Sequence, residues 1–446
     1  MLGLANPQAR PLPFVKLVIP LLISRAALDA YLSNFYVTMG ALSVTPGALL
    51  NLLIVACAAL IFLRQTDLAA PKLAVLCWSP FLLWSAMEAL RSPDLPSAVK
   101  VMFAYVSFAS VFYVALEYNL LSRSRSALAA IFALSAIIPL TVALVQIAIS
   151  GGDSERIAGS MPHPNIFAFY LTILIPVLYE RILAADTARY ERALYGAIAG
   201  LALIALLMTG TRSAWIGLYL FLMLYTLLTK PALTPVLLIL PLAALGLPEV
   251  RDRLFNAVDA GSIPDASHIQ MMARGQVAGS GLSGLNSFAW RKLLWAATLE
   301  EVWKNPIVGH GLEAFPHNVV NFFSIAQGES GAAHNIYVQM LYESGLAGLI
   351  SFLWIPFSAF LVAARRSIDK KYFIISIPLL MIFLIESYSD NMLYYLVDNW
   401  YFWFVFGTFL SYFLGRGRRV HANPVDQVDR VGWMRARLEG ARPGRI

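Results

Sequence analysis

The sequence predicts an all-α integral membrane protein with about twelve transmembrane helices, and three observations lead to this fold class. Of the 446 residues, 59% are hydrophobic and only 13% are charged, whereas a soluble domain carries about 25% charged residues. The mean hydropathy is +0.67. The apolar residues are gathered in runs of roughly 20, the length that crosses the hydrocarbon core of a bilayer.

Twelve segments have this length and composition. The first is the weakest, because Arg25 and Asp29 interrupt it, and only Lys230-Pro231 separates the eighth from the ninth. The predicted spans are 16–36, 45–63, 71–90, 98–119, 126–150, 164–184, 193–209, 213–229, 231–248, 337–364, 371–390 and 396–414.

The basic residues are spread unevenly over the loops, and this predicts the orientation. With both termini in the cytoplasm, 22 of the 33 lysines and arginines fall in cytoplasmic segments, and 10 fall outside. Six of those 10 lie in one long loop at about 249–333, where charge has little influence on topology. The rule therefore predicts cytoplasmic termini, and the net charge of +7 requires no nucleic-acid partner.

The predicted organisation is a membrane domain over 1–414, which includes the large loop 249–333, and a basic cytoplasmic tail over 415–446. Within the loop, Ser287 is expected to cap a helix that stops at Pro306 and lies at the lipid interface. Cys57 and Cys77 lie in apolar runs, which predicts packing roles and no disulfide or metal arrangement.

Two residues on the predicted outer side each have two interpretations. Arg212, in "TGTRSAWIG" between two spans, is either a functional residue or an interfacial arginine that reaches for water. His334, at the start of the tenth predicted span, is either a helix-start histidine bonded to a loop carbonyl or a general base. Imidazole suits the second role, since its ordinary pKa near 6.5 lets it accept a proton at physiological pH.

Other polar residues on this side leave further alternatives open. Asp390 could orient His334 or pair with an arginine, and a structural ion pair is an equal alternative. His310 and His317 could complete a metal site with His334, but no carboxylate at convincing spacing supports one, so no metal is predicted. His163, in "MPHPN", is interpreted as a turn residue.

A longer pattern begins at His334. It consists of a histidine, then Asn335, nine residues, Gly345, two residues and Gly348. With "TGTRSAWIG" and "WRKLLWAATLEEVWKNPIVGHGLEAF", it resembles the O-antigen ligase/polymerase family of bacterial membrane proteins, most strongly over about 150–364. The glycine spacing predicts two positions without side chains on one helix face, which would let a neighbour approach closely.

The resemblance implies a GT-C-like fold and a metal-independent, inverting glycosyltransferase without a cofactor. It implies the bacterial inner membrane, with the active site facing the periplasm. The donor would be a glycan on undecaprenyl diphosphate, and the acceptor would be lipid A-core or a second lipid-linked glycan. Membrane lipids would surround the protein.

The resemblance also implies roles for single residues. His334 would deprotonate the acceptor hydroxyl, and fixed guanidinium groups would hold the diphosphate. Arg212 and Arg291 carry over directly, whereas Arg156 is an extension from its place in the loop before the sixth span. Asn335 and Asp390 would support the site.

Ligase and polymerase share these parts. The complete signature favours a ligase, while the loop "GSMPHPNIFAFY" resembles exopolysaccharide polymerases as much as ligases. Transfer of glycans to protein hydroxyls is a third possibility. A polysaccharide flippase or other transporter is the alternative from another class, but transporters typically place their charges near the bilayer midplane.

Overall fold

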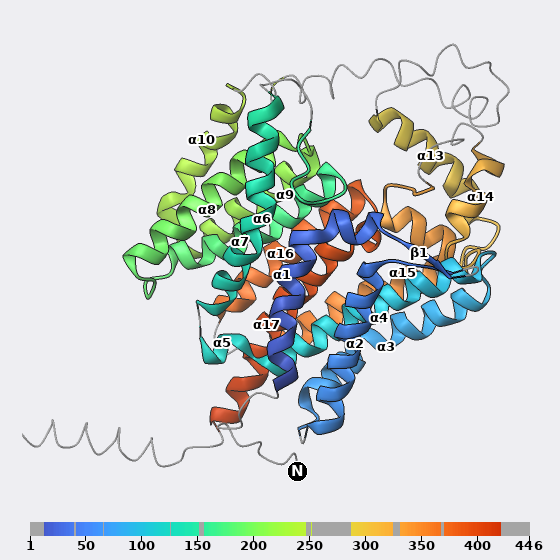
Figure 1. The fold of residues 1–446 in the computed structure, drawn as a ribbon, viewed down its shortest axis with the longest axis horizontal. Helices are drawn as coiled ribbons and strands as arrows, with labels where there is room; N and C mark the ends of the chain where they lie inside the picture. Colours follow the sequence, from blue (N-terminus) through green and yellow to red (C-terminus); the bar gives the residue numbers. More distant parts are fainter. Residues whose placement is uncertain are drawn as a thin grey trace, which may run out of the picture.

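Helices occupy most of each apolar segment that the sequence predicts (Figure 1). The computed structural model describes residues 13–39, 42–65, 67–124, 126–150, 156–246, 251, 287–323, 331–366 and 370–420. The elements of the first half are α1 (Pro13–Asn34), β1 (Val37–Met39), β2 (Leu42–Val44), α2 (Pro46–Arg64), α3 (Ala69–Leu90), α4 (Leu95–Tyr118), α5 (Leu120–Arg123), α6 (Ala127–Ser150), α7 (Pro164–Leu183), α8 (Arg189–Met208), α9 (Arg212–Thr229), η1 (Pro231–Leu233) and α10 (Thr234–Ala244).

The second half begins with two short helices that follow the undescribed part of the long loop. Its elements are α13 (Ser287–Val302), α14 (Ala314–Phe322), α15 (Ile336–Arg366), α16 (Lys370–Ser389), η4 (Met392–Tyr394) and α17 (Leu396–Val420). Residues 415–420 of the predicted basic tail belong to α17, whereas 421–446 and, in the loop, 252–286 and 324–330 lie outside the described residues.

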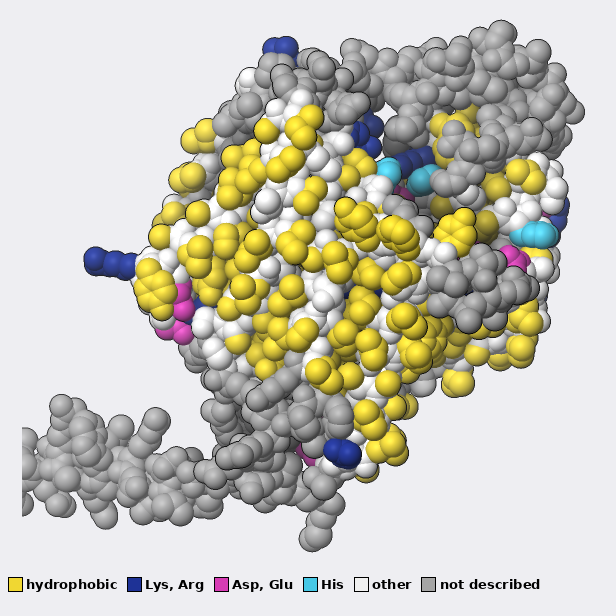
Figure 2. Space-filling view, in the orientation of Figure 1, with side chains coloured by type: hydrophobic (Ala, Val, Ile, Leu, Met, Phe, Trp, Pro, Cys, Tyr) yellow, Lys and Arg dark blue, Asp and Glu magenta, His cyan; other side chains and the backbone are white. Residues whose placement is uncertain are grey.

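Eight helices of the described residues are long and apolar enough to cross a membrane, namely α2, α3, α4, α6, α7, α8, α9 and α15. Figure 2 shows their apolar side chains across the middle of the molecule. The protein is therefore a helical, multi-pass membrane protein. The count of twelve spans stays a prediction.

The remaining predicted spans are also helical, with differences from an uninterrupted apolar span. α1 contains Arg25 and Asp29, and α17 has Asp398 in its first turn. The ninth predicted span, 231–248, contains a 3-10 turn and the 11-residue α10. At 1.5 Å per residue, α10 is about 16 Å long, roughly half the thickness of the hydrocarbon core.

One short hairpin departs from the all-α prediction. β1 and β2 pair antiparallel between α1 and α2, with Val37 opposite Val44 and Met39 opposite Leu42. Each strand has three residues, which is too short to form a layer of its own. The bundle is otherwise helical in the part that the structure describes.

The centre of the bundle is built by α4, α7 and α17. α17 packs along α4 and α7, while α15 packs along α3, and α16 packs along α9. Aromatic rings fill the core: Trp78 and Trp403 meet edge to face at 4.8 Å between ring centroids, and Phe383 stacks on Phe402 at 4.1 Å. Such ring pairs add to the stabilisation from burial alone.

The charges that interrupt α1 are paired inside the protein. Arg25 and Asp29 form an ion pair of 3.1 Å, and both side chains are almost fully buried. The guanidinium also donates to the Gly47 carbonyl and lies over the ring of Trp400. Pairing of this kind lets a charged residue lie in an apolar helix.

Several helix ends meet at one face of the bundle, below called the His334 face. The backbone N–H of Ala30, near the end of α1, donates to the Ser160 carbonyl just before α7. His334, before α15, contacts Asp390, after α16. The orientation prediction assigns all these ends to one side of the membrane.

The two loop helices pack against protein. Leu293 and Leu294 of α13 are buried with Phe315 of α14 and Tyr342 of α15 in a second apolar cluster. The helix predicted from Ser287 is therefore present, but its main apolar face is covered by α14 and α15 and does not face lipid.

Candidate active site

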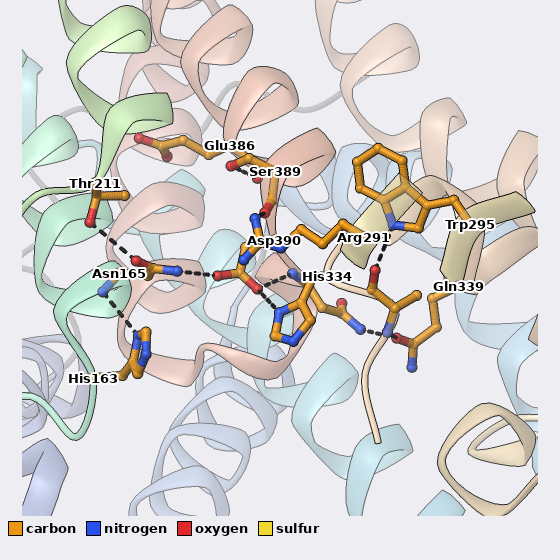
Figure 3. A network of polar contacts seen from close by, with 12 residues as sticks. His163, Asn165, Thr211, Arg291, Trp295, His334, Gln339, Glu386, Ser389 and Asp390 are labelled. Carbon is orange, nitrogen blue, oxygen red and sulfur yellow. Dashed lines mark hydrogen bonds and ion pairs between the residues drawn. The ribbon is translucent and has the colours of Figure 1, made fainter. Parts of the chain in front are cut away.

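His334 and Asp390 form the centre of a polar site at the His334 face (Figure 3). Nδ1 of His334 lies 3.0 Å from Oδ1 of Asp390, and the side chains are 23% and 2% exposed. His334 itself precedes α15 and has a left-handed backbone, with φ of 49°. His334 was predicted at the start of the helix, but α15 begins at Ile336, two residues later.

Asn335 explains why the helix begins directly after the histidine. Its Oδ1 accepts hydrogen bonds from the backbone N–H groups of Tyr337 and Val338, at 3.0 and 3.2 Å. This caps the N-terminus of α15, where backbone donors have no partner within the helix. Because Asn335 directly follows His334, this cap also restrains the backbone at His334.

Asp390 is held as an anion. Its Oδ2 accepts from Nδ2 of Asn165 at 2.6 Å, and its Oδ1 accepts from the Asn391 N–H at 2.9 Å. Burial favours the neutral acid, but the hydrogen bond and charge of His334, the charge of Arg291 and the bond from Asn165 lower the pKa of Asp390 to about 2. An ionised carboxylate only accepts, so Nδ1 of His334 must be the donor of their bond.

The arginines lie on two sides of this pair. Arg291 of α13 donates from Nη1 to the Ser389 carbonyl at 2.7 Å, one residue before Asp390. On the other side, Arg156 donates to the Thr209 carbonyl, to Oδ1 of Asn165 and to Oγ1 of Thr211. Both guanidinium groups are half-buried.

Arg212 lies next to the groups that Arg156 contacts. It is the first residue of α9, directly after Thr211, and is half-buried. Arg156 is linked to Asp390 through Asn165, and Arg291 through the backbone of Ser389. Asp390 contacts His334, which directly precedes Asn335. Arg212 directly follows Thr211, which Arg156 contacts. Figure 2 shows histidine and basic side chains gathered near the upper edge of the apolar surface.

Gln339 connects the two segments that carry His334 and Asp390. Its Oε1 accepts from the backbone N–H of Ala333 at 3.1 Å and from Nδ2 of Asn391 at 2.6 Å. Trp295 of α13 donates to the Ala333 carbonyl at 2.7 Å. Both backbone groups of the residue before His334 are therefore held by buried side chains.

Gly345 interrupts helix α15. Its φ of 63° and ψ of −169° divide the helix in two, a backbone conformation open essentially to glycine alone. The chain at 306–311 lies against the break: Leu346 and Ala347 donate to the carbonyls of Pro306 and Ile307. A Cβ on Gly345 would overlap the Ile307 carbonyl.

The prediction of two glycines on one helix face is therefore corrected. The close approach at Gly345 is present, but the neighbour is the loop segment 306–311 and the helix is interrupted there. At Gly348, an added Cβ would overlap the Cβ of Ser344 and would lie 3.2 Å from Cδ1 of Trp84 in α3, so the predicted close approach of a neighbouring helix is present there. Gly345 therefore interrupts the helix, whereas Gly348 lies where α3 packs closely against α15.

Residues 197–353 match the family model described as O-antigen ligase. Over this range the chain is similar to the O-antigen ligase family. Among curated proteins, none matches the chain. The matched range includes Arg212, Arg291, His334 and Gly345, whereas Arg156 and Asp390 lie outside it and are connected to it through the contacts described above.

His163 belongs to the surroundings of this site, although its sequence context indicated only a turn. It caps α7, and its Nδ1 accepts the backbone N–H of Asn165 at 3.1 Å. Burial first, then the charge of Arg156, lower the pKa of His163; His334 and Arg291 add to this, and Asp390 opposes it. The signal that the sequence did offer is the pattern His-Pro-Asn at the start of a span on the outer side.

The other two histidines considered for a metal site lie elsewhere in the matched range. His310 stacks on Tyr342 at 4.5 Å between ring centroids, and its Nε2 lies 3.2 Å from the Glu301 carbonyl. His317 is exposed on α14. In the described part of the chain, no group of three or more His, Cys, Asp or Glu side chains has the spacing to hold a metal ion.

Proposed function

We propose that this protein is an O-antigen ligase of the bacterial inner membrane, which transfers a glycan from undecaprenyl diphosphate to lipid A-core on the periplasmic side. The observation that carries the proposal is the contact of His334 with a buried, ionised Asp390 between arginines on two sides. The similarity to the O-antigen ligase family supplies the class of reaction, ligase- or polymerase-type glycosyl transfer.

The proposed proton acceptor is Nε2 of His334. Because Nδ1 donates to Asp390, the neutral imidazole carries its lone pair on Nε2. The acceptor hydroxyl gives its proton to this nitrogen while its oxygen attacks the anomeric carbon of the donor sugar. The carboxylate of Asp390 stabilises the imidazolium that forms.

The leaving group is the diphosphate. The bond between the anomeric carbon and the diphosphate oxygen breaks, and the electron pair leaves with undecaprenyl diphosphate, which gains one negative charge. Attack from the opposite side inverts the configuration at that carbon. Arg156, Arg212 and Arg291 hold this charge, since guanidinium groups stay protonated and match phosphate oxygens in geometry. No metal or nucleotide takes part in the proposed step.

The test is glycan transfer by the purified protein with a lipid-linked donor and EDTA, with either lipid A-core or a second lipid-linked repeat as acceptor. We expect product on lipid A-core. His334→Ala should lower the rate by about a hundred- to ten-thousand-fold, the usual contribution of a positioned base. His317→Ala is the matched control, because that histidine is exposed on α14.

Other results would assign a different function. A ladder of glycan lengths on the lipid carrier would mean a polymerase, and glycan on protein hydroxyls would mean a protein glycosyltransferase. No product with any acceptor, or full activity of His334→Ala, would contradict the mechanism. Uptake of lipid-linked glycan into vesicles without transfer would mean a transporter.

A further inference from the structure

His163 is fixed at the edge of the site by the start of α7. It occupies the N-cap position, and Pro164 begins the helix. The backbone N–H of Asn165 donates to Nδ1 at 3.1 Å, and the side chain is partly buried and partly exposed. The proton of the neutral ring is therefore on Nε2, on the edge of the ring that points away from the α7 backbone.

Asn165 also determines where this ring lies relative to the proposed base. Its Nδ2 donates to Oδ2 of Asp390, whose Oδ1 contacts His334. Its Oδ1 accepts from Arg156. Asn165 thus connects His163, Arg156 and the His334–Asp390 pair, and Figure 3 shows it between His163 and Asp390.

The surroundings of His163 favour a neutral donor. Arg156, Arg291, His334 and Asp390 all lie within electrostatic range of it. Burial and the three cationic or basic groups outweigh the carboxylate and lower the pKa of His163. A ring that stays neutral keeps its bond from Asn165 and adds a hydrogen-bond donor without adding another positive charge.

We propose that His163 is a second substrate-contacting histidine, whose Nε2–H donates to a phosphate oxygen of the diphosphate donor. The proposal rests on the proposed function for the identity of that donor. A phosphate oxygen is the strongest acceptor that would enter a site lined by arginines, and its negative charge grows as the sugar leaves. The hydrogen bond therefore strengthens during the reaction and should affect kcat more than KM.

Two variants distinguish the helix-capping role of His163 through Nδ1 from its proposed role as a hydrogen-bond donor through Nε2. His163→Asn keeps an acceptor at the N-cap, where asparagine is among the preferred residues, but lacks a donor at the position of Nε2. His163→Gln places an N–H close to that position and weakens the cap. If His163 contacts substrate, the Asn variant should lose about ten- to a hundred-fold in kcat, and the Gln variant should lose less.

A capping role alone predicts the opposite order, with the Asn variant close to wild type and the Gln variant impaired. That order, or wild-type kcat in both variants, would overturn the proposal. Equal loss of activity together with a lower melting temperature in both variants would overturn it as well. His317→Ala again provides the control for a histidine outside the site.

Binding of undecaprenyl diphosphate without a glycan provides a readout that does not depend on transfer. We expect His163→Asn to bind it more weakly than wild type does, and equal affinity would contradict the contact. If wild-type protein transfers no glycan to any acceptor, the proposed function fails, while this binding comparison still decides the role of His163. If transfer requires His334 but not His163, only the inference about His163 fails.

Discussion

Two histidines at the His334 face carry their ring protons on opposite nitrogens. Nδ1 of His334 donates to the ionised Asp390, which leaves the lone pair on Nε2. Nδ1 of His163 accepts from a backbone N–H, which leaves the proton on Nε2. The first ring is therefore suited to accept a proton and the second to donate a hydrogen bond, and in each case the partner of Nδ1 decides.

Replacement of Asp390 by asparagine tests the first assignment. Asp390→Asn removes the charge that stabilises the imidazolium and leaves one acceptor oxygen where two now receive hydrogen bonds. We expect kcat for glycan transfer to fall by about a hundred- to ten-thousand-fold, with a smaller change in KM for the donor. Asp186→Asn is the control, because Asp186 pairs with Arg181 away from the site. A kcat within a few-fold of wild type would contradict the role of Asp390.

The same carboxylate predicts an acid dependence of stability. The pKa of Asp390 is about 2 in the folded protein and lies below its ordinary value of 3.8. A lowered pKa stabilises the fold above the ordinary value, and this contribution is lost as the pH falls from about 4 to about 2. The melting temperature of wild type should therefore fall toward that of Asp390→Asn over this range. A constant difference between the two proteins from pH 6 to pH 2 would show that Asp390 is not held as an anion.

At the scale of elements, α15 is two helices that meet at Gly345. The first, which begins after His334, bears Gln339; the second, from Leu346 to Arg366, is about 31 Å long at 1.5 Å per residue. The second part alone is as long as the hydrocarbon core is thick. The break therefore lets the first part follow the contacts of the site while the second part crosses the membrane.

Substitution of the glycine at the break should disturb both parts. Gly345→Ala places a Cβ against the Ile307 carbonyl at a positive φ, which we expect to destabilise the fold by roughly 1–3 kcal/mol. Thermal unfolding in detergent, followed together with transfer activity, measures this. Gly196→Ala in α8 is the control, because nothing lies within 4 Å of the added atom. A Gly345→Ala protein as stable as Gly196→Ala would mean that the break is not required.

Gln339 connects the segment that carries His334 with the segment that carries Asp390. Gln339→Leu removes the acceptor of the Ala333 and Asn391 donors, so that His334 and Asp390 are no longer held in register. A displacement of about 1 Å is enough to lower kcat by about a hundred-fold. Steady-state kinetics should show a loss of kcat with little change in KM, whereas Gln65→Leu, which removes a bond to Tyr113, should not. Unchanged kcat in Gln339→Leu would exclude this positioning role.

At the scale of the whole molecule, the apolar runs were sufficient to predict helices at all twelve positions, because span length and composition are local properties. The break at Gly345, the helix α14 and the packing of α13 on protein could not be predicted, since each depends on contacts between distant segments. The same holds for His163, whose charged neighbours lie on other elements, and for Gln339, whose partner Asn391 follows α16. His334 and Arg212 could be selected because polar residues at the ends of apolar runs stand out, whereas Arg291, in the long loop, was selected through the family resemblance.

The orientation of the whole bundle is the remaining prediction, and two exposed positions on opposite sides test it. Trp303, after α13, is 80% exposed, and Tyr190, at the start of α8, is 74% exposed. The native Cys57 and Cys77 are both buried, so single cysteines at the exposed positions can be labelled selectively. With 22 of 33 basic residues on the cytoplasmic side, a membrane-impermeant maleimide should label Trp303→Cys in intact spheroplasts and Tyr190→Cys only after lysis. The reverse pattern would put His334 in the cytoplasm, away from a donor that is presented in the periplasmic leaflet, and would rule out the proposed ligase reaction.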